Sequence, residues 1–469
     1  MCILRRAWDA VLRDYCLGIK VQNSRFSSTV LPEQIAQVSE MGGRIAVTLS
    51  VFAAIAAVLA QRDIPTGPLS GLAATTPTTS PSKLIGRLPA LGWNSWNAYR
   101  CDINEAKIIA AATQLLSLGL KDVGYEYVNI DDCWAEMQRD PLTKRLVPDS
   151  KKFPNGIKSV ADKIHAMGLK FGIYSDAGFA TCEKYPGSLG YESIDAETFS
   201  EWGVDYLKYG KTPNWTDTST VVPPFGDWYH SNSAIRYRQM GHALASQPRP
   251  IEFAICSWGE GHVWEWGSRV GHSWRMTKDS RPQWSFVKSF IETNVAHLSK
   301  TDFFGHNDMD MMEIGNGDLD LPEQRTHFAA WAFLKSPILL GTDLSALSSE
   351  QANIIKNKEL LAFNQDATVG TPALPFVPYS GAPTTSPPEY YAGRSSKGVH
   401  VFVINTSSYK RTMQFPIANV PNLLPAADYR IHDMWTGADH LTTYTRDSTV
   451  AVTLSAHDTA AYLINSVRP

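Results

Sequence analysis

The sequence has few cysteines, no large excess of either charge and no uninterrupted apolar run of membrane-spanning length. Its 469 residues include 6 cysteines, 43 lysines and arginines, and 46 aspartates and glutamates, which gives a formal net charge of -3. Such a balance provides no electrostatic attraction for nucleic acid or for an anionic membrane. Neither Cys-x-x-Cys nor His-x-x-x-His occurs, so we expect no structural zinc and no other metal site.

One apolar run without charge, residues 45–60, stands near the N-terminus. It is short for a bilayer-spanning helix, which needs about 20 apolar residues. Read from Met41, a leader containing Arg44, the apolar run and the small residues before Gln61 have the layout of a secretory signal peptide. We therefore expect a signal peptide at 41–60 and a doubtful upstream segment at 1–40. A signal anchor with a cytoplasmic tail is the alternative.

The segment after the signal also favours export. Residues 61–87 contain a Thr/Ser/Pro tract with nothing apolar to bury, so we expect an extended linker that is open to O-glycosylation. N-glycosylation sequons begin at Asn214 and Asn405. A small even number of cysteines remains after residue 60, as is typical of secreted chains. These features predict a secreted, extracellular glycoprotein without stable membrane insertion after signal removal. The remaining cysteines are Cys101, Cys133, Cys182 and Cys256.

Between residues 91 and 345, short apolar or β-branched runs alternate with helical patterns. One helical pattern, 105–116, follows Asn104, whose side chain can cap the first turn. Eight such alternations over about 250 residues are what a closed (β/α)8 barrel requires, and short crossovers favour parallel strands. The interval between Cys256 and Ser273 is too short for a full helix. An open doubly wound sheet is the alternative. The strand candidates are 91–95, 125–131, 169–175, 204–209, 251–256, 273–275, 303–305 and 338–340.

The pattern changes after Leu374, where a Pro/Ser/Thr-rich loop precedes runs of period-two alternation such as 398–404 and 448–454. Alternation of this kind without intervening helices indicates antiparallel strands. We therefore expect an α/β chain, with a (β/α)8 TIM barrel at 88–374 followed by a C-terminal antiparallel β-sandwich domain at 375–469, whose role is structural.

Carboxylates follow several predicted strands, on the side where a barrel holds its active site. Carboxylates bind hydroxyl groups and aromatic rings cover the apolar face of a sugar, so the combination favours a carbohydrate pocket. A glycosidase needs two carboxyl groups across the scissile bond. The structural alternative for each residue is a cap on the following helix or a buried ion pair. The carboxylates are Asp131, Asp132, Asp176, Asp279, Asp308, Asp310 and Asp343, and the neighbouring aromatic residues are Trp93, Trp96, Tyr174, Trp258 and Trp274.

Several motifs resemble those of the secreted α-galactosidases (melibiases) of glycoside hydrolase family 27, and they occur in the same order along the chain. The resemblance extends from about residue 88 to the C-terminus and includes DMWTG (433–437) and AHDTA (456–460) in the β-domain. It implies a retaining enzyme that releases terminal α-D-galactose from oligosaccharides or polysaccharides, with no metal or organic cofactor. The barrel motifs are LGWNSWN (91–97), NIDDCW (129–134), GIYSDAG (172–178), WGVDYLKY (202–209), SWR (273–275) and NDMDM (307–311).

The resemblance also implies roles for individual residues. Asp279 corresponds to the general acid/base, which protonates the leaving oxygen and later activates water. Asp131 and Asp132 correspond to the pair that binds galactose hydroxyls, and Arg275 corresponds to a sugar-contacting arginine. Cys101 and Cys133 match one family disulfide. Further expected substrate-binding positions are Trp96, Tyr174, Lys208, Ser257, Trp258 and Asp310.

The chain departs from the family at the nucleophile, because the family reads Lys-Tyr-Asp where this chain reads Lys208-Tyr209-Gly210. Glycine cannot form a glycosyl ester. Strand alternation places 206, 208 and 210 on one face, so Asp205 is expected to point elsewhere. Asp217 and Asp227 lie in the following loop.

The same departure affects a cysteine. In the family, the partner of Cys182 lies two residues after the nucleophile, and this chain has no cysteine between 182 and 256. Loss of both features suggests replacement of a short segment, by a splice-junction or gene-prediction error or by true degeneration of the enzyme. The transcript across codons 208–214 distinguishes these. Three functions remain open: α-galactosidase, α-N-acetylgalactosaminidase, for which Ser257 is small enough, and a non-catalytic galactoside-binding pseudoenzyme.

Overall fold

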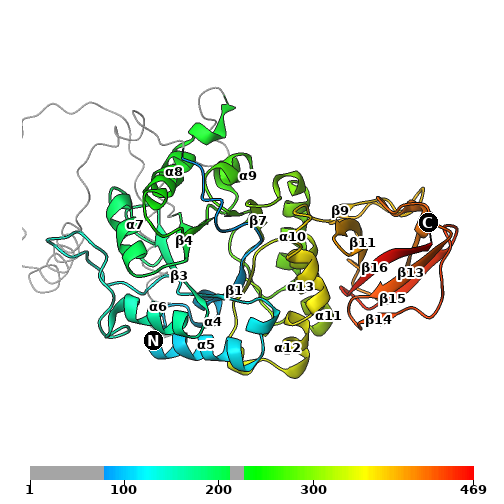
Figure 1. The fold of residues 1–469 in the computed structure, drawn as a ribbon, viewed down its shortest axis with the longest axis horizontal. Coiled ribbons are helices and arrows are strands. Elements are labelled where there is room, and N and C mark those ends of the chain that lie inside the picture. The colour runs from blue at the N-terminus through cyan, green and yellow to red at the C-terminus, as the bar shows by residue number, and fades with distance from the viewer. Residues whose placement is uncertain (1–78, 212–225, 469) are drawn as a thin grey trace, which may run out of the picture. The chain divides into compact units, whose positions relative to one another are not determined.

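The computed structural model describes residues 79–211 and 226–468 (Figure 1). All described residues belong to one compact unit, 64–469. The expected upstream segment, the expected signal peptide, most of the expected linker and the sequon at Asn214 lie outside the described residues. Within 79–211 and 226–468, no helix is long and apolar enough to cross a membrane.

Eight parallel strands form one sheet in the spatial order β7-β6-β5-β4-β3-β2-β1-β8, with helices around it (Figure 1). Successive strands in the sequence are therefore neighbours, and β1 pairs with both β2 and β8. This order confirms the barrel and rules out a doubly wound sheet, whose strand order reverses at its centre. The strands are β1 (Leu91–Asn94), β2 (Tyr127–Asn129), β3 (Lys170–Asp176), β4 (Tyr206–Gly210), β5 (Glu252–Ile255), β6 (Ser273–Arg275), β7 (His306–Asp308) and β8 (Ile338–Leu340).

The ring closes just beyond the end of β7. Met312 and Leu340 form a parallel bridge. Met312 N donates to Leu339 O at 2.8 Å, and Gly341 N donates to Met312 O at 2.9 Å. The segment after β7 thus supplies the hydrogen bonds to β8 that a closed barrel needs.

Seven of the eight expected strands overlap observed ones, and the seventh prediction is wrong. Residues 303–305 form a turn in which Gly305 N donates to Asp302 O at 3.1 Å. Phe304 has φ 65°, in the left-handed region, which breaks the extended backbone of a strand. The observed strand begins at His306. Between Cys256 and Ser273 the only α-helix has 4 residues, as the short interval predicted.

The helices follow the predicted alternation. Asn104 caps α5 as expected, because its side chain accepts a hydrogen bond from Lys107 N at 2.9 Å. The helices are α4 (Ser95–Tyr99), α5 (Glu105–Ser117), α6 (Gly156–Ala166), α7 (Glu192–Glu201), α8 (Asn232–Ala245), α9 (Val263–Trp266), α10 (Trp284–Val295), α11 (Leu321–Phe333), α12 (Ser349–Ile355) and α13 (Lys358–Asn364).

Side chains alternate between the barrel interior and the surrounding layer of helices. Tyr127, Tyr206 and Leu339 belong to one small buried cluster inside the barrel, whereas Trp93 and Trp274 are fully buried in the large core shared by strands and helices. Trp93 and Trp274 were expected beside the pocket, and that expectation is wrong. Each lies one residue from an inward-facing position, and a shift of one residue turns a strand side chain to the other face.

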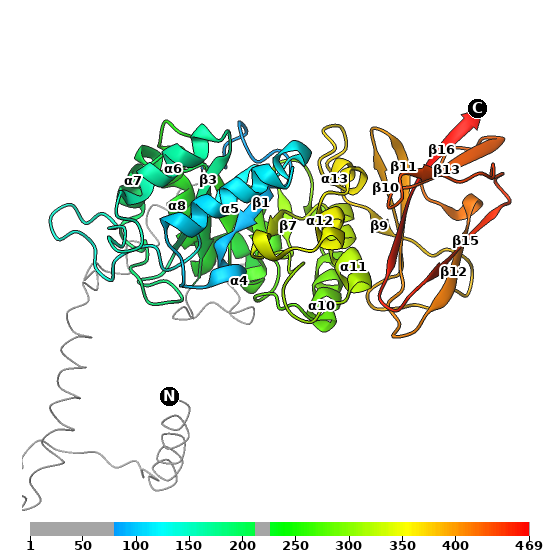
Figure 2. The ribbon, with the colours of Figure 1, turned by 90° about the horizontal axis from the view of Figure 1, so that it is seen from below.

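The C-terminal domain is a β-sandwich, as predicted (Figure 2). A six-stranded sheet of order β14-β13-β16-β11-β10-β9 shares one apolar core with the pair β12-β15. The domain contacts the barrel through α11, where Arg325 Nε lies 2.9 Å from Asp458 Oδ1. The strands are β9 (Leu374–Pro375), β10 (Tyr390–Ser395), β11 (Gly398–Ile404), β12 (Arg411–Pro416), β13 (Asp428–Asp433), β14 (Ala438–Asp439), β15 (Thr449–Leu454) and β16 (Thr459–Arg468).

The sequon at Asn405 lies in this domain, and the Asn405 side chain is fully buried. Its amide nitrogen donates to Tyr409 O at 2.8 Å and to Ser455 O at 2.7 Å. A glycan needs that nitrogen at the surface, so we do not expect Asn405 to carry one in the folded protein.

Candidate active site

Asp131 stands at the end of β2, against residues from β1 and β4. It accepts hydrogen bonds from Lys208 Nζ at 2.7 Å and from Asn94 Nδ2 at 2.9 Å. Burial would lower the pKa of Lys208, but the adjacent carboxylate outweighs burial and raises it. Because both side chains are largely buried, each compensates the charge of the other. The structure thus brings together two of the residues expected in the pocket.

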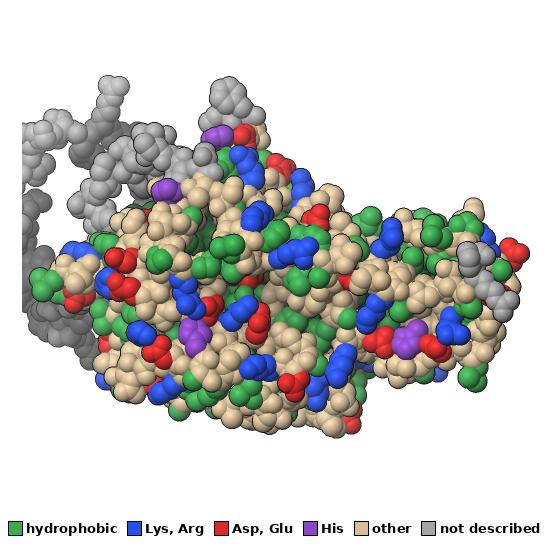
Figure 3. Space-filling model, in the orientation of Figure 1, with side chains coloured by type: hydrophobic (Ala, Val, Ile, Leu, Met, Phe, Trp, Pro, Cys, Tyr) green, Lys and Arg blue, Asp and Glu red, His purple; other side chains and the backbone are tan. Residues whose placement is uncertain are grey.

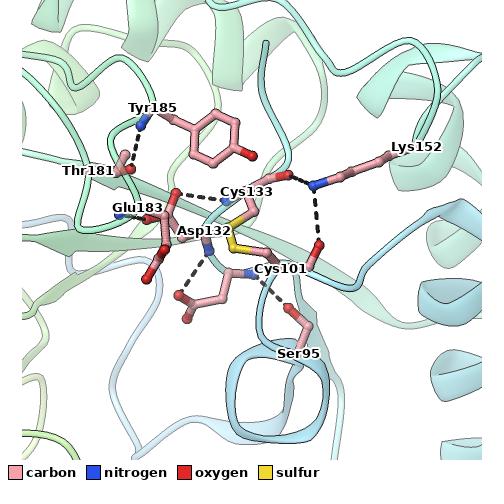
Figure 4. The surroundings of a disulfide bond; sticks show 9 residues. Ser95, Cys101, Asp132, Cys133, Lys152, Thr181, Glu183 and Tyr185 are labelled. Atoms are coloured by element: carbon pink, nitrogen blue, oxygen red, sulfur yellow. Dashed lines mark hydrogen bonds between the residues drawn. A yellow bond between two sulfur atoms is a disulfide. The ribbon is translucent and has the colours of Figure 1, made fainter. Parts of the chain in front are cut away.

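Asp132 directly precedes Cys133, which forms a disulfide with Cys101, and it also contacts the backbone at Glu183 (Figure 4). Its Oδ1 accepts from Cys133 N at 2.7 Å and its Oδ2 from Glu183 N at 3.0 Å. Burial raises the pKa of Asp132 to about 6, although these backbone hydrogen bonds oppose the rise. Cys133 itself has φ 74°, a strained conformation for a non-glycine residue. The disulfide and its strained backbone therefore determine where Asp132 points.

Arg275, at the end of β6, joins the two carboxylates that follow β6 and β7. Its guanidinium contacts Asp310 Oδ1 at 2.6 Å and Asp279 Oδ1 at 3.1 Å. Arg275 and Asp310 are buried, whereas the side chain of Asp279 is 54% exposed. Burial favours a higher pKa for Asp279, but the charges of Arg275 and Lys208 prevail and lower it. Asp279 is consequently an accessible anion at the rim of a buried ion-pair network.

Glu313 supports this network and no motif marks it in the sequence. It accepts hydrogen bonds from Asn97 Nδ2 at 2.5 Å and from Ser280 Oγ at 2.8 Å. Ser280 N in turn donates to Asp310 Oδ2 at 2.6 Å. Glu313 thereby links the β1 motif to the residue that follows Asp279. Its only sequence signal is an acidic side chain shortly after the predicted seventh strand.

Position 210 lies at the end of β4, paired in register with Asp176 of β3. A Cβ atom built on Gly210 would lie 2.1 Å from Tyr174 Oη and 2.7 Å from Asp176 Oδ2. Tyr174 and Asp176 therefore occupy the space beside Gly210 into which a side chain would project. The alternation predicted for β4 is confirmed, since Tyr206 faces the barrel interior and Lys208 reaches Asp131.

Neither described aspartate near this strand substitutes for a side chain at 210. Asp205 immediately precedes β4, and its carboxylate contacts His165 Nε2 at 2.7 Å and accepts a hydrogen bond from Phe171 N at 2.8 Å. Asp227 caps a short 3-10 turn, and its Oδ1 accepts from Tyr229 N at 3.0 Å. Asp217 lies outside the described residues.

The remaining expected positions are distributed around the same strand ends. Cys182 has no disulfide and lies 3.8 Å from Tyr174 Oη, and Cys256 Sγ lies 3.6 Å from Arg275. Trp258 has φ 56°, and among the described residues neither its Nε1 nor Ser257 Oγ has a hydrogen-bond partner. A polar ligand could supply the hydrogen bonds that these buried polar atoms lack.

Two expected residues behave differently. Trp96 is only partly buried, with Arg100 over its ring at 5.0 Å, and no contact joins it to the carboxylates. Asp343 follows the structural alternative, because its Oδ1 accepts from Ser345 N at 3.0 Å and caps the turn after β8. In the described part of the chain, no group of three or more His, Cys, Asp or Glu side chains is arranged to hold a metal. On the face shown in Figure 3, side chains of both charges are interspersed.

Comparison with known proteins identifies the family. The profile of α-galactosidase A matches residues 88–366, and that of the α-galactosidase C-terminal β-sandwich domain matches residues 385–464. The chain belongs to the α-galactosidases of the melibiase family, glycoside hydrolase family 27. A protein of Aspergillus clavatus named probable α-galactosidase B is 45% identical over 418 residues, which are 81% of this chain and 93% of that protein.

Solved structures agree with this assignment. α-Galactosidase I from Mortierella vinacea superposes with a TM-score of 0.73 at 34% identity, covering 82% of this chain and 98% of that one. The α-galactosidase of Saccharomyces cerevisiae, solved with raffinose, has a TM-score of 0.72 at 27% identity, covering 82% and 100%. The family assignment makes this chain a glycosidase of the α-galactosidase family.

Proposed function

We propose that this pocket binds the terminal α-D-galactosyl unit of an oligosaccharide or polysaccharide. The observation that carries the proposal is the pairing of acidic and basic side chains at the ends of four barrel strands: Asp131 and Asp132 after β2, Lys208 on β4, Arg275 on β6 and Asp310 after β7. A sugar offers several hydroxyl groups in fixed directions, and alternating charged acceptors and donors can bind them at once. The yeast relative solved with raffinose supports a galactoside of this kind.

Asp279 is proposed as the general acid/base. Its exposed carboxyl group can reach a leaving oxygen, while Arg275 holds its position from the buried side. An acid with a lowered pKa donates its proton less readily near neutral pH, so we expect this half of the reaction to favour acidic conditions.

Position 210 is proposed as the place of the family's nucleophile. Gly210 ends β4 on the inward-facing side, two residues after Lys208, where the family motif carries its aspartate. A glycine provides no carboxylate for the glycosyl intermediate. We therefore propose that the chain as written recognises α-galactosides and hydrolyses them slowly. An error in the gene prediction would also explain a glycine at position 210, and sequencing the transcript across codons 208–214 tests that explanation.

Titration calorimetry with galactose tests recognition directly. Binding by the folded protein is expected, and it should be weaker in Asp131→Asn and Asp132→Asn. Absence of binding by a protein with a normal melting transition would refute the proposal. Normal turnover by the unmodified chain would show that the role assigned to position 210 is wrong.

The related specificity for α-N-acetylgalactosamine is less well supported. Ser257 is fully buried and small, which would leave room near a 2-acetamido group. The names of the similar proteins favour galactose. Hydrolysis of the two nitrophenyl glycosides by the Gly210→Asp protein is expected to favour the galactoside, and a preference for the N-acetyl sugar would overturn this choice.

Secretion is proposed on the expected signal peptide and on the Cys101–Cys133 disulfide, because such bonds persist in oxidising compartments. N-terminal sequencing of protein recovered from culture medium is expected to show a start after residue 60. Retention of residues 45–60 in a membrane fraction would instead support the signal anchor.

A further inference from the structure

The end of β4 has lost a carboxylate, but the space beside it holds two reactive groups. Tyr174 Oη lies 2.1 Å from the Cβ position of residue 210, and Asp176 Oδ2 lies 2.7 Å from it. Asp176 is the direct cross-strand neighbour of Gly210 in the parallel sheet. A phenolic oxygen and a carboxylate oxygen therefore both lie close to where the missing side chain would begin.

These two groups are also in contact with each other. Tyr174 Oη donates to Asp176 Oδ2 at 3.3 Å and lies 3.8 Å from Cys182 Sγ. The carboxylate is the stronger acceptor and the nearer one. Asp176 is held in turn, because its Oδ1 accepts from Gly178 N at 2.7 Å. A tyrosine beside a carboxylate that can take its proton is a known form of glycosidase nucleophile, used by sialidases.

Tyr174 belongs to the pocket that contains the acid/base. Lys208, which binds Asp131, lies 5.5 Å from the centre of the Tyr174 ring. Cys182, in contact with Tyr174, is close enough to Asp279 for the charge of that carboxylate to influence its thiol. Tyr174 and Asp279 are therefore linked through shared neighbours, Lys208 and Cys182.

We propose that Tyr174 Oη acts as the nucleophile in this chain, with Asp176 as the base that accepts its proton. The proposal rests on the proposed galactoside site, because it assigns the attacking atom within that site. Burial and the charge of Asp176 hold the pKa of Tyr174 well above its usual value. The phenol is therefore neutral in the resting protein, and its proton must leave as the new bond forms.

The reaction balances in two steps. In the first, Tyr174 Oη forms a bond to C1 of galactose, the bond from C1 to the aglycone oxygen breaks, Asp176 receives the phenolic proton, and Asp279 protonates the departing oxygen. In the second, water attacks C1 and gives a proton to Asp279. The bond from C1 to Tyr174 Oη breaks, and Asp176 returns the proton to the phenol. Two inversions at C1 give retention, and no oxidant or reductant is required.

Tyr174→Phe removes the attacking oxygen and keeps the ring. We expect kcat on nitrophenyl α-galactoside to fall by at least about 100-fold, the scale of a lost catalytic group. Asp176→Asn keeps an acceptor for Gly178 N and is expected to lower kcat similarly. The matched control is Tyr209→Phe, since Tyr209 precedes Gly210 but packs outside the barrel against Tyr237 and Phe253. The control is expected to keep its activity.

A second comparison separates a nucleophile from a residue that merely shapes the pocket. In the Gly210→Asp protein a carboxylate is available for attack, so Tyr174→Phe is expected to reduce kcat far less than in the unmodified chain. An equal loss in both backgrounds would mean that Tyr174 acts by position alone, and would overturn the proposal.

Covalent trapping identifies the attacking atom. A fluorinated α-galactosyl fluoride that slows the second step is expected to label the peptide containing Tyr174. A bond to tyrosine withstands hydroxylamine, whereas an ester of Asp176 is cleaved by it. Ester chemistry on Asp176, or hydrolysis unaffected by Tyr174→Phe, would overturn the assignment. So would a complete lack of turnover in a chain that still binds galactose. Lack of galactose binding would instead refute the proposed function.

Discussion

Two neighbouring corners of the pocket are held together by different means. At the end of β2, a disulfide, a buried ion pair and backbone hydrogen bonds surround Asp131 and Asp132. At the ends of β3 and β4, Cys182 has no disulfide, and Gly210 leaves its space to Tyr174 and Asp176. The two corners touch, because Glu183, one residue after Cys182, donates its N–H to Asp132.

This difference separates two requirements that a glycosidase normally meets together. In the proposed function, recognition depends on the charged groups that follow β2, whose positions are fixed by several independent bonds. Bond cleavage depends on one atom at one place, so a single residue at the end of β4 can remove it. Recognition can be retained when bond cleavage is impaired, so a chain can bind galactosides well while it hydrolyses them slowly.

The largest effect is expected from restoring the carboxylate. Gly210→Asp is predicted to raise kcat/KM on nitrophenyl α-galactoside by at least about 1000-fold, since removal of a nucleophile elsewhere costs more than that. Tyr174 must tilt away, because its hydroxyl lies 2.1 Å from the new Cβ. Galactose affinity should change little. Steady-state kinetics measures kcat/KM, and calorimetry measures galactose affinity. A rise in affinity without a rise in rate would contradict the separation of recognition from bond cleavage.

The next effect concerns stability. The Cys101–Cys133 bond closes a separation of 32 residues, so replacing both cysteines by serine is expected to lower the free energy of unfolding by about 3 to 4 kcal/mol. Cys182→Ser, in the other corner, breaks no covalent bond and should cost less than about 1 kcal/mol. Urea denaturation measures both. Equal losses would contradict the claim that only the β2 corner is covalently held.

Galactose binding should depend on Asp132 more than on Asp343. Asp132→Asn removes the charge and is predicted to weaken galactose binding about 10- to 100-fold, the range for a hydrogen bond to a charged group. Asp343→Asn is the matched control, because Asp343 caps the turn after β8 and bonds Tyr99, away from Asp131 and Asp132. Calorimetry with both variants checks this weakening, and identical affinities would remove Asp132 from the binding site.

The smallest effect is a pH dependence. Burial raises the pKa of Asp132 to about 6, so the carboxylate gains a proton as pH falls below that value. Galactose affinity is therefore expected to fall about tenfold between pH 7 and pH 5, because the deprotonated fraction of Asp132 falls by about that factor over this range. The folded state holds this proton more tightly than the unfolded state, so the contribution to stability falls as pH rises from about 4 to 6. Calorimetry at several pH values tests the first statement, and an unchanged profile in Asp132→Asn would contradict it.

Much of the fold could be predicted because the relevant signals are local. The alternation of apolar runs with helical patterns predicted the barrel, and Asn104 was correctly assigned as a helix cap. The seventh strand was misplaced because one left-handed residue, Phe304, is not visible in an apolar pattern. Trp93 and Trp274 were misassigned because one residue separates the inside of a barrel from its outer layer.

The sequence by itself determined the family, the barrel with its β-domain, the acidic strand ends and the glycine at the end of β4. Only the tertiary structure decided which of those acidic residues lie together, because the strand ends come from segments far apart in the chain. It showed that Glu313 supports the network and that Asp343 caps the turn after β8. It also showed that Tyr174 and Asp176 meet beside Gly210. The register between β3 and β4 places Asp176 opposite Gly210, and register depends on how two strands pair rather than on either strand alone.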